Sequence, residues 1–269
     1  MKNIWTVTWY SLREALARKV FIFFFVISIL TIIFVALILN LTGIEKVFAP
    51  GVQPDLFNAV NTLEMMFISP ITLICLLLSI FSSASFIPIM LEKGNIDLLL
   101  SKPISREQLL LGKFFGGILV VFLNIAFLII GVWLIFSFKF SIWNFEFLIT
   151  IFTITFIFSI LYSIIVFFGI ITKSSTLGMM IAYLLFLIVS PALYTAKYKF
   201  ALFIQNNIIK GVIDFAYYIL PKTSELMGKT NYDLASGHGI TNYQPVLTSL
   251  LFLVLTLGIS VAIFRKKDF

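Results

Sequence analysis

The sequence predicts an all-α integral membrane protein with six transmembrane helices. Of its 269 residues, 61% are hydrophobic and only 12% are charged, whereas soluble domains average about 25% charged residues. Six stretches lack Asp, Glu, Lys and Arg, and each is long enough to supply the roughly 20 helical residues that cross a hydrocarbon core of about 30 Å. The charges fall in the segments between these stretches, where a membrane protein meets water.

Residues 1–19 are expected to form an interfacial helix that precedes the first span. Its apolar residues recur at helical spacing on one face, namely Trp5, Trp9, Leu12, Leu16 and Val20. The opposite face carries Glu14 and Arg18, a pair of opposite charge four residues apart. The competing interpretation is a signal peptide, because a basic region precedes an apolar stretch. That stretch is too long for a cleaved signal and no small-x-small site follows it, which favours the interfacial helix.

The six expected spans belong to a single transmembrane domain, residues 1–269, and cover residues 20–41, 65–91, 114–138, 147–172, 174–196 and 245–264. Only a tight turn around Lys173 separates the fourth span from the fifth, which predicts an antiparallel hairpin. Proline clashes with the carbonyl four residues before it, so Pro70, Pro88 and Pro191 are each expected to kink a span. The small residues at 82–85 predict a close approach of two helices.

The distribution of Lys and Arg predicts the orientation of the spans. With the N-terminus inside, the cytoplasmic segments hold 12 of these residues and the short external loops hold 2. A longer external segment, residues 197–244, holds 5 more and counts weakly because long loops translocate with little regard to charge. Both termini and residues 92–113 are therefore expected in the cytoplasm. This bias also accounts for the net charge of +7 without a nucleic-acid partner.

Residues 92–113, between the second and third spans, are expected to form a cytoplasmic elbow. Residues 90–113 hold 7 of the chain's 31 charged residues, which must lie outside the hydrocarbon. Pro103 ends the preceding helix, and Ser105 is expected to cap the next one, with Gln108 completing a capping box. A cytoplasmic partner can pack on the apolar residues of the elbow, which are Ile96, Leu98, Leu99 and Leu100. The alternative interpretation is a solvated connecting loop.

Two local motifs resemble those of a known family. Residues 92–106 read Glu-Lys-Gly-Asn-Ile-Asp-Leu-Leu-Leu-Ser-Lys-Pro-Ile-Ser-Arg and are followed by Leu-Leu-Leu-Gly-Lys at residues 109–113. This run resembles the cytoplasmic coupling segment of type-2 ABC exporter permeases, although Asn95 stands where Thr is more usual. The C-terminal Phe-Arg-Lys-Lys-Asp-Phe, residues 264–269, resembles the terminal Phe-x-x-Lys-Asp-Phe of the same permeases.

The resemblance implies a permease subunit in the plasma (inner) membrane of a prokaryote, bound to a cytoplasmic ABC ATPase. In that family the coupling segment sits in a cleft of the ATPase, and a second permease, identical or homologous, completes the transporter. ATP and Mg would be bound by the ATPase, because this chain has no Gly-x-x-x-x-Gly-Lys-Ser/Thr motif. The residues expected to dock the ATPase are Glu92, Gly94, Asp97, Leu98, Pro103, Arg106 and Lys113.

The external segment 197–244 is the least hydrophobic part of the chain. Apolar residues at helical spacing predict an amphipathic helix up to Pro221, lying on the outer leaflet or on the bundle. Residues 223–239 are expected to form a loop. The segment either caps the bundle or binds an external partner at residues 200–244. Residues 218–221, Tyr-Ile-Leu-Pro, resemble the permeases associated with maturation of periplasmic multicopper enzymes, of the nitrous oxide reductase maturation type.

Three hypotheses about function remain open at this stage. The first is ATP-driven export of a substrate, which is expected to be amphipathic or lipid-like because no charged residue falls in the middle of a span. The second is a relay that transmits ATP hydrolysis to a periplasmic maturation protein, and the third is a membrane scaffold without an ATPase. Glu64, at the mouth of the second span, is expected to face water. His238 and Cys75 have no neighbours that predict a metal or nucleophilic site, and the chain itself is not expected to be an enzyme.

Overall fold

The fold is all-helical and contains the six expected spans. The structure, a computed structural model, describes residues 2–17, 20–41, 56–92, 94–96, 104–200 and 207–267. No strand occurs among these residues. Six of their helices are long and apolar enough to cross a membrane, and each overlaps one predicted span. The first half of the chain forms α1 (Lys2–Ala17), α2 (Val20–Leu41), α3 (Leu56–Ser83), α4 (Phe86–Met90), α6 (Arg106–Phe140), η2 (Phe145–Ile149) and α7 (Thr150–Thr172).

The second half of the chain forms the fifth and sixth spans and the helices between them. These elements are α8 (Ser175–Leu184), the π-helix η3 (Leu185–Val189), α9 (Ser190–Tyr198), α10 (Asn207–Ile219), α11 (Thr223–Glu225), the π-helix η4 (Leu226–Thr230), α12 (Asn231–Ala235) and α13 (Gln244–Lys266). The expected turn at Lys173 separates α7 from α8, and its backbone has a φ of 55°. The prediction of a hairpin between these two spans is confirmed, since α7 and α8 pack together.

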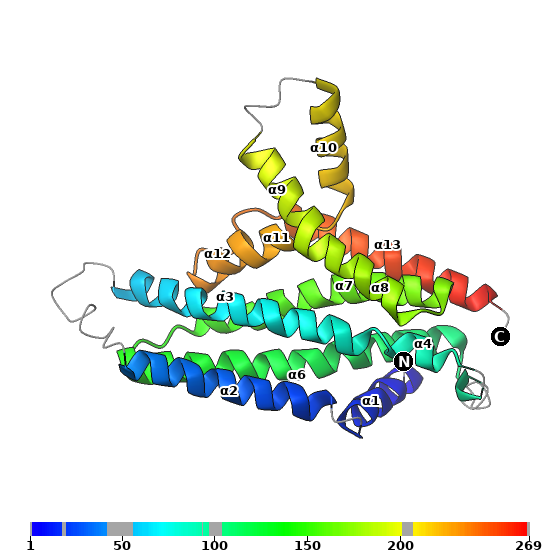
Figure 1. The fold of residues 1–269 in the computed structure, drawn as a ribbon, viewed down its shortest axis with the longest axis horizontal. Helices are drawn as coiled ribbons and strands as arrows, with labels where there is room; N and C mark the ends of the chain where they lie inside the picture. Colours follow the sequence, from blue (N-terminus) through cyan, green and yellow to red (C-terminus); the bar gives the residue numbers. More distant parts are fainter. Residues whose placement is uncertain are drawn as a thin grey trace.

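Helix α7 lies at the centre of the bundle. Of the residues in the most apolar stretch of its span, 78% are buried inside the chain. The corresponding share is 22% for α2 and 11% for α13. Figure 1 shows α2, α3, α6 and α7 running along the long axis of the molecule, with α13 beside α7. Phe158 and Tyr162 of α7 are fully buried, and Tyr162 stacks on Phe114 of α6. The helices α2, α8 and α13 therefore present most of their apolar surface to the surroundings of the chain.

Two of the three prolines coincide with irregular backbone. Helix α3 ends at Ser83 and α4 begins at Phe86, so the second span breaks at Ala84. Ala84 lies four residues before Pro88, and the proline ring would clash with its carbonyl in a continuous helix. Pro191 follows the π-helix η3, which contains the corresponding carbonyl of Leu187. Pro70 lies inside α3, which continues through it. The irregularities place a break in the second span and a bulge in the fifth.

The external segment is more ordered than expected. Helix α10 confirms the predicted amphipathic helix from Asn207 onwards, and Figure 1 shows it standing away from the bundle beside α9. The loop predicted for residues 223–239 is wrong over residues 223–235, which form α11, η4 and α12. Leu226 and Ala235 are fully buried there, so packing against the bundle overrides the weak helical propensity of a Gly- and Asn-containing sequence.

Candidate functional site

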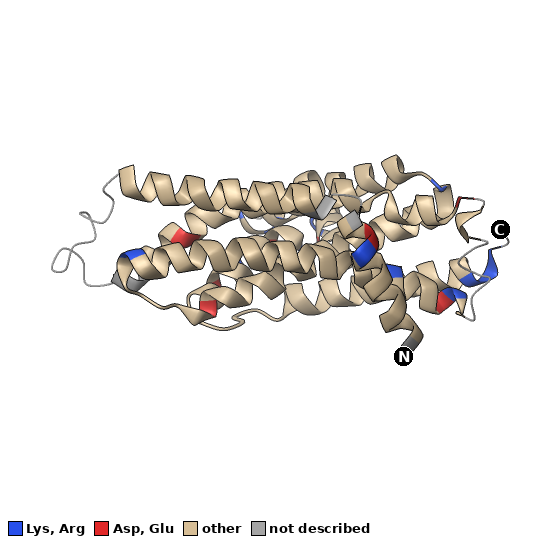
Figure 2. Cartoon of the chain, turned by 90° about the horizontal axis from the view of Figure 1, so that it is seen from below, with Lys and Arg blue, Asp and Glu red and all other residues tan. Residues whose placement is uncertain are grey.

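The candidate site is the end of the bundle at which both termini lie. Figure 1 marks the N- and C-termini at the same end, and Figure 2 shows both basic and acidic residues at this end. Six side chains or carbonyls from distant parts of the sequence meet at this end. We refer to them as the terminal cluster: Asn3, Arg106, Glu107, Gln108, Arg265 and Lys267.

The predicted capping box at the start of α6 is confirmed. The backbone N–H of Gln108 donates to the Ser105 hydroxyl at 3.2 Å, and the Ser105 N–H donates to Gln108 Oε1 at 3.3 Å. Two otherwise unpaired N–H groups of the helix start are satisfied in this way. Asn3 Nδ2 donates to the same Gln108 Oε1 at 3.1 Å, which ties the start of α1 to the start of α6.

Arg106 ties the start of α6 to the end of α13. Its Nη1 donates to the carbonyl of Lys267 at 2.5 Å and to that of Arg265 at 3.3 Å. These carbonyls lie at a helix C-terminus, where acceptors have no partner within the helix. Arg265 in turn lies 3.4 Å from Glu107 Oε1, and Lys267 donates to the carbonyl of Ile170 at the end of α7. Burial, and secondly the nearby Lys173 cation, lowers the pKa of Lys267. Three helices are therefore joined at one point.

Glycines hold α1 close against α6. A Cβ at Gly112 would lie 2.5 Å from Val7 Cβ, and a Cβ at Gly116 would lie 2.4 Å from Ser11 Cβ. Only glycine permits this approach, as in small-x-x-x-small packing of membrane helices. Thr8 Oγ1 also donates to the Gly112 carbonyl across the contact, at 3.2 Å. The spacing of Gly112 and Gly116 is the signal that would have predicted this packing from the sequence.

Lys113 lies inside this contact, because its side chain is 6% exposed and pairs with Glu14. Its Nζ also lies 5.7 Å from the ring centroid of Tyr10. From the sequence, Glu14 was predicted to pair with Arg18, which lies outside the described residues. Lys113 was predicted to lie on the docking surface. In the structure the Lys113 ammonium joins α6 to α1, so its position suits a positioning role.

The exposed side of α1 carries both tryptophans. Trp5 is 66% exposed and Trp9 46%, whereas Leu12, predicted on the same face, is buried. The buried side instead includes Val7 and Ser11. Part of the predicted polar face of α1 therefore packs on α6, and the tryptophans remain available to the membrane.

The other expected docking residues lie at the edge of the described chain. Glu92 is exposed, and Gly94 has a φ of 93°, a backbone conformation that glycine adopts without strain. Asp97, Leu98 and Pro103 lie outside the described residues. Ile96, expected to be available to a partner, is 1% exposed and packs in the core of the chain.

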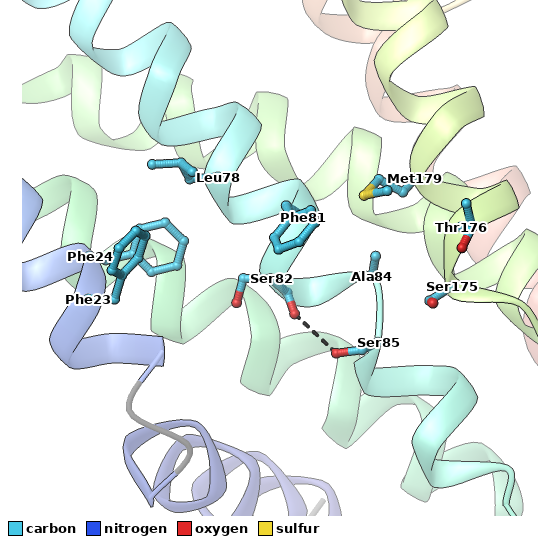
Figure 3. A pocket seen from close by; sticks show the side chains of 10 residues that line it. All are labelled: Phe23, Phe24, Leu78, Phe81, Ser82, Ala84, Ser85, Ser175, Thr176 and Met179. Atoms are coloured by element: carbon cyan, nitrogen blue, oxygen red, sulfur yellow. Dashed lines mark hydrogen bonds between the residues drawn. The ribbon is translucent and has the colours of Figure 1, made fainter.

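A cavity of about 540 Å³ opens at the break in the second span, between α2, α3 and α8. Figure 3 shows Phe23 and Phe24 on one side, the hydroxyl groups of Ser175 and Thr176 on the other, and Phe81 between them. Ser85 Oγ donates to the carbonyl of Ser82 at 3.4 Å. The close helix approach predicted for residues 82–85 is therefore wrong at Ser82 and Ser85, which line a space. The turn at residues 84–85 moves the chain aside and leaves this opening.

A comparison with known protein families identifies the family of the chain. A model of the family described as ABC-2 family transporter protein matches residues 5–269. The chain belongs to the ABC-2 transporter family. It is thus a multi-pass membrane permease of the ABC transporter class, and membership in this family implies an associated ATPase subunit. No curated protein matches the chain significantly.

A second polar cluster of this ABC-2 permease joins α9, α10 and α11, and Figure 1 shows α9 and α10 standing out from the side of the bundle. The Tyr217 hydroxyl donates to Glu225 Oε2 at 2.6 Å and lies 3.1 Å from the Tyr198 hydroxyl. The ammonium groups of Lys222 and Lys197 lie 4.0 and 4.1 Å from the Tyr217 ring centroid. Burial raises the pKa of Tyr217, and burial lowers the pKa of Lys222 to about 8 despite the nearby Glu225. No sequence pattern predicts this cluster, since its members meet only in the fold.

Glu64 of the ABC-2 permease is buried, so the expectation that it faces water is wrong. Glu64 is 1% exposed, and its Oε2 has no hydrogen-bond partner among the described residues. The physical reason is that α3 begins at Leu56, which places Glu64 more than two turns inside the helix. Among the described residues, no three His, Cys, Asp or Glu side chains gather where they would hold a metal ion.

Proposed function

We propose that this ABC-2 permease is the membrane-spanning part of an ATP-driven exporter, and that its ATPase docks on residues 92–113. The observation that carries the proposal is the terminal cluster. It joins the start of α6, which forms the last part of the proposed docking segment, to α1 and to the end of α13. A force applied to the docking segment would thus move three helices together.

The proposed transmission follows the packing of α6. This helix runs without interruption from Arg106 to Phe140 and contacts α1, α2, α3 and α7. Closure of the ATPase pair would push on the contact residues Glu92, Gly94, Asp97, Leu98 and Pro103. In this proposal Arg106 and Lys113 are positioning residues, because Arg106 holds the end of α13 and Lys113 holds α1. Coupling of this kind requires a packed element with two arrangements, and α6 with its attached helices is the candidate element.

The distribution of charge supports a cytoplasmic location for this end. Figure 2 shows Lys and Arg residues at this end, and the positive-inside rule favours such residues in short cytoplasmic segments. The ATPase would bind ATP and Mg, and the permease would supply no nucleotide site and no catalytic group. A second permease, identical or homologous, would complete the transporter, since ATPases of this class work as pairs.

The cavity at the break in the second span supports an amphipathic or lipid-like substrate. Aromatic side chains such as Phe24 and Phe81 suit a hydrocarbon chain, whereas the hydroxyls of Ser82, Ser175 and Thr176 suit a polar group. Among the described residues, no Asp, Glu, Lys or Arg lines the cavity. A highly charged substrate would find no described side chain in this cavity to balance its charge.

Co-purification tests the docking proposal. The tagged permease is purified in mild detergent from its native membrane, and the bound proteins are identified by mass spectrometry. We expect a P-loop ATPase with the native chain and its loss with Asp97→Arg or Leu98→Asp. A matched control is Lys210→Asp, because Lys210 is exposed on α10, which Figure 1 shows standing away from the bundle. Retention of the ATPase by both docking variants would refute the proposed site, and recovery of no ATPase with the native chain would favour the scaffold hypothesis.

The second candidate function is a mechanical relay to a periplasmic partner of the multicopper enzyme maturation type. The observation that favours it is the ordered external segment, in which the Tyr217 cluster fixes α10 against α9 and α11. A relay would need such a rigid outer surface, whereas a simple connecting loop would not. Recovery of a periplasmic protein with the permease and its ATPase, lost on deletion of residues 207–219, would favour the relay over solute export.

A further inference from the structure

A further cavity lies between α3 and the two π-helices, η3 and η4. Its volume is about 300 Å³, at the lower end of the range of about 300–1,000 Å³ that is typical of small-molecule sites. Residues of both π-helices line it, among them Leu187 of η3 and Gly228 of η4. A Cβ added at Gly228 would meet nothing within 4 Å. Such π-helices are rare and often occur at functional sites, which makes this cavity a candidate binding site.

A hydrogen bond separates this cavity from the one at the break in the second span. The Tyr183 hydroxyl of α8 donates to the Leu77 carbonyl of α3 at 2.7 Å. Along α3, Leu77 lies between Leu73, which lines the present cavity, and Leu78, which lines the other. Along the fifth span, Tyr183 likewise lies between the lining residues of the two cavities. The two cavities are therefore distinct sites along the same pair of helices.

The π-helix η3 and the proline after it leave two adjacent carbonyls without the donors that an α-helix would supply. The Ser190 N–H donates to the carbonyl of Leu185, five residues back, instead of to that of Phe186. Pro191 has no N–H that could donate to the carbonyl of Leu187. Residues four apart lie on the same face of a helix, and both Leu187 and Pro191 line the cavity. The cavity therefore borders backbone carbonyls that a ligand can use as hydrogen-bond acceptors.

The other lining residues favour an uncharged ligand with an apolar body. Ser69 and Ser224 are polar, whereas Leu73 and Met227 are apolar. The Ser224 N–H donates to Ser190 Oγ at 2.9 Å, which fixes α11 against the fifth span and keeps the cavity pre-formed. Among the described residues, no Asp, Glu, Lys, Arg or His lines it. An ammonium or carboxylate group would therefore lose its hydration without gaining a counter-charge, whereas a neutral hydrogen-bond donor finds acceptors.

We propose that this cavity binds a small uncharged amphiphile that carries a hydroxyl group. The hydroxyl group of the ligand donates to the carbonyl of Leu187, and its apolar body lies against Leu73 and Met227. The site does not rest on the proposed export function. A permease that binds no ATPase would retain it.

Photolabelling with an octanol that carries a diazirine tests the site. The purified permease in lipid nanodiscs is irradiated with this probe, and the labelled residues are mapped by mass spectrometry. We expect saturable labelling within residues 69–73, 186–191 or 224–228. Unlabelled octan-1-ol should displace the probe about tenfold more effectively than 1-methoxyheptane, which has no hydroxyl proton, because one hydrogen bond contributes about this factor. Octylammonium should also displace it less effectively than octan-1-ol.

Two outcomes of this experiment would overturn the proposal. Labelling of these residues that rises without saturation would show that the probe reaches them from the bilayer and not in a site. Equal displacement by octan-1-ol and by 1-methoxyheptane would show that the cavity does not recognise a hydroxyl group.

Replacing Pro191 tests the role of the carbonyl. Pro191→Ala restores an N–H that can donate to the carbonyl of Leu187 and so removes the acceptor. Pro88→Ala is the matched control, because it removes the proline at the other irregular span and Pro88 is not part of the cavity lining. We expect Pro191→Ala to weaken displacement by octan-1-ol about tenfold and Pro88→Ala to leave it unchanged. Equal displacement in the two variants would contradict the carbonyl as acceptor.

A filling variant tests the location without altering a proline. Gly228→Leu places a side chain in the open space beside η4, and Gly258→Leu makes the same change on α13, where a Cβ also meets nothing within 4 Å. We expect Gly228→Leu to abolish the saturable labelling and Gly258→Leu to retain it. Saturable labelling that survives in Gly228→Leu would place the bound alcohol outside this cavity.

Discussion

Substituting Gly112 by Ala tests whether α1 is held on α6 by direct backbone approach. The added Cβ would lie 2.5 Å from Val7 Cβ, 2.6 Å from Val7 Cγ1 and 3.1 Å from the carbonyl of Ile4. Two of these distances are too short for any carbon contact, and the atoms concerned sit on or next to the backbone of α1. The helix α1 must therefore shift away from α6, which also lengthens the Thr8 hydrogen bond to Gly112.

The magnitude of the effect follows from three contributions. Overpacking a close contact costs about 1–3 kcal/mol, and losing a hydrogen bond costs about 0.5–1.5 kcal/mol. Replacing a helical Gly by Ala stabilises the helix by about 1 kcal/mol. The net expectation for Gly112→Ala is a loss of about 0.5–3.5 kcal/mol from the free energy of unfolding. Gly258 of α13 provides the matched control, since a Cβ there would meet nothing within 4 Å.

The chain contains a natural reporter for this comparison. Cys75 is its only cysteine and is 7% exposed, so a thiol-reactive fluorophore labels it only on unfolding. Thermal unfolding in detergent is followed by this labelling. We expect Gly112→Ala to melt below the native chain and Gly258→Ala to melt at or above it. Equal melting temperatures for the two variants would refute the close approach of α1 to α6.

Three further predictions concern buried polar groups. Lys113→Met removes the ammonium that pairs with Glu14 at the contact of α1 and α6, and we expect a larger loss of thermal stability than in the double variant with Glu14→Leu, because losing one member of a buried ion pair costs more than replacing both. The pKa of Lys222 in the folded chain is about 8, below its ordinary value of 10.5. Between these two pH values the unfolded chain therefore binds more protons than the folded chain. Thermal stability should therefore rise from pH 8 to about 10, where tyrosines begin to titrate, and Lys222→Met should flatten the rise. Glu64→Leu removes a buried acceptor that has no partner in the described part of the chain and should stabilise the chain by about 1–3 kcal/mol, whereas Glu64→Gln, which keeps a buried polar group, should not.

Each of these predictions has an outcome that contradicts it. The ion pair would contribute nothing if Lys113→Met and the double variant melted together with the native chain. If thermal stability rises with pH equally in Lys222→Met and in the native chain, the rise comes from a group other than Lys222. Equal stability of Glu64→Leu and Glu64→Gln would show that the carboxyl group has a partner.

The sequence predicts those parts of the fold that depend on local composition. Uncharged runs of spanning length predict the six spans, and Ser105 with Gln108 predicts a helix start that the structure confirms. Both signals operate within a few residues of the chain, so no knowledge of tertiary contacts is needed. The prolines predict irregular backbone for the same reason, and two of the three coincide with it.

The remaining features depend on contacts between distant segments. Lys113 has a suitable charge for a docking surface, but in the fold its ammonium pairs with Glu14 and is buried. Glu14 lies 99 residues earlier in the sequence, so no local pattern predicts this pair. Glu64 was expected in water because it follows a polar loop, yet its position within α3 buries it. Residues 223–235 contain loop-forming residues and become helical because Leu226 and Ala235 pack on the bundle. In each case tertiary packing decides an environment that local composition leaves undetermined.

The docking of an ATPase on residues 92–113 is tested most directly by site-specific cross-linking. Cys75 is first replaced by Ser, and a single cysteine is then introduced at Glu92 or, as the control, at Lys210. Each variant is co-expressed with the ATPase that co-purifies with the native chain and is treated with a short thiol-to-amine cross-linker. We predict a cross-linked product with the ATPase for Glu92→Cys and none for Lys210→Cys. A product for Lys210→Cys, or none for Glu92→Cys in a complex that still co-purifies, would contradict docking at this end of the bundle.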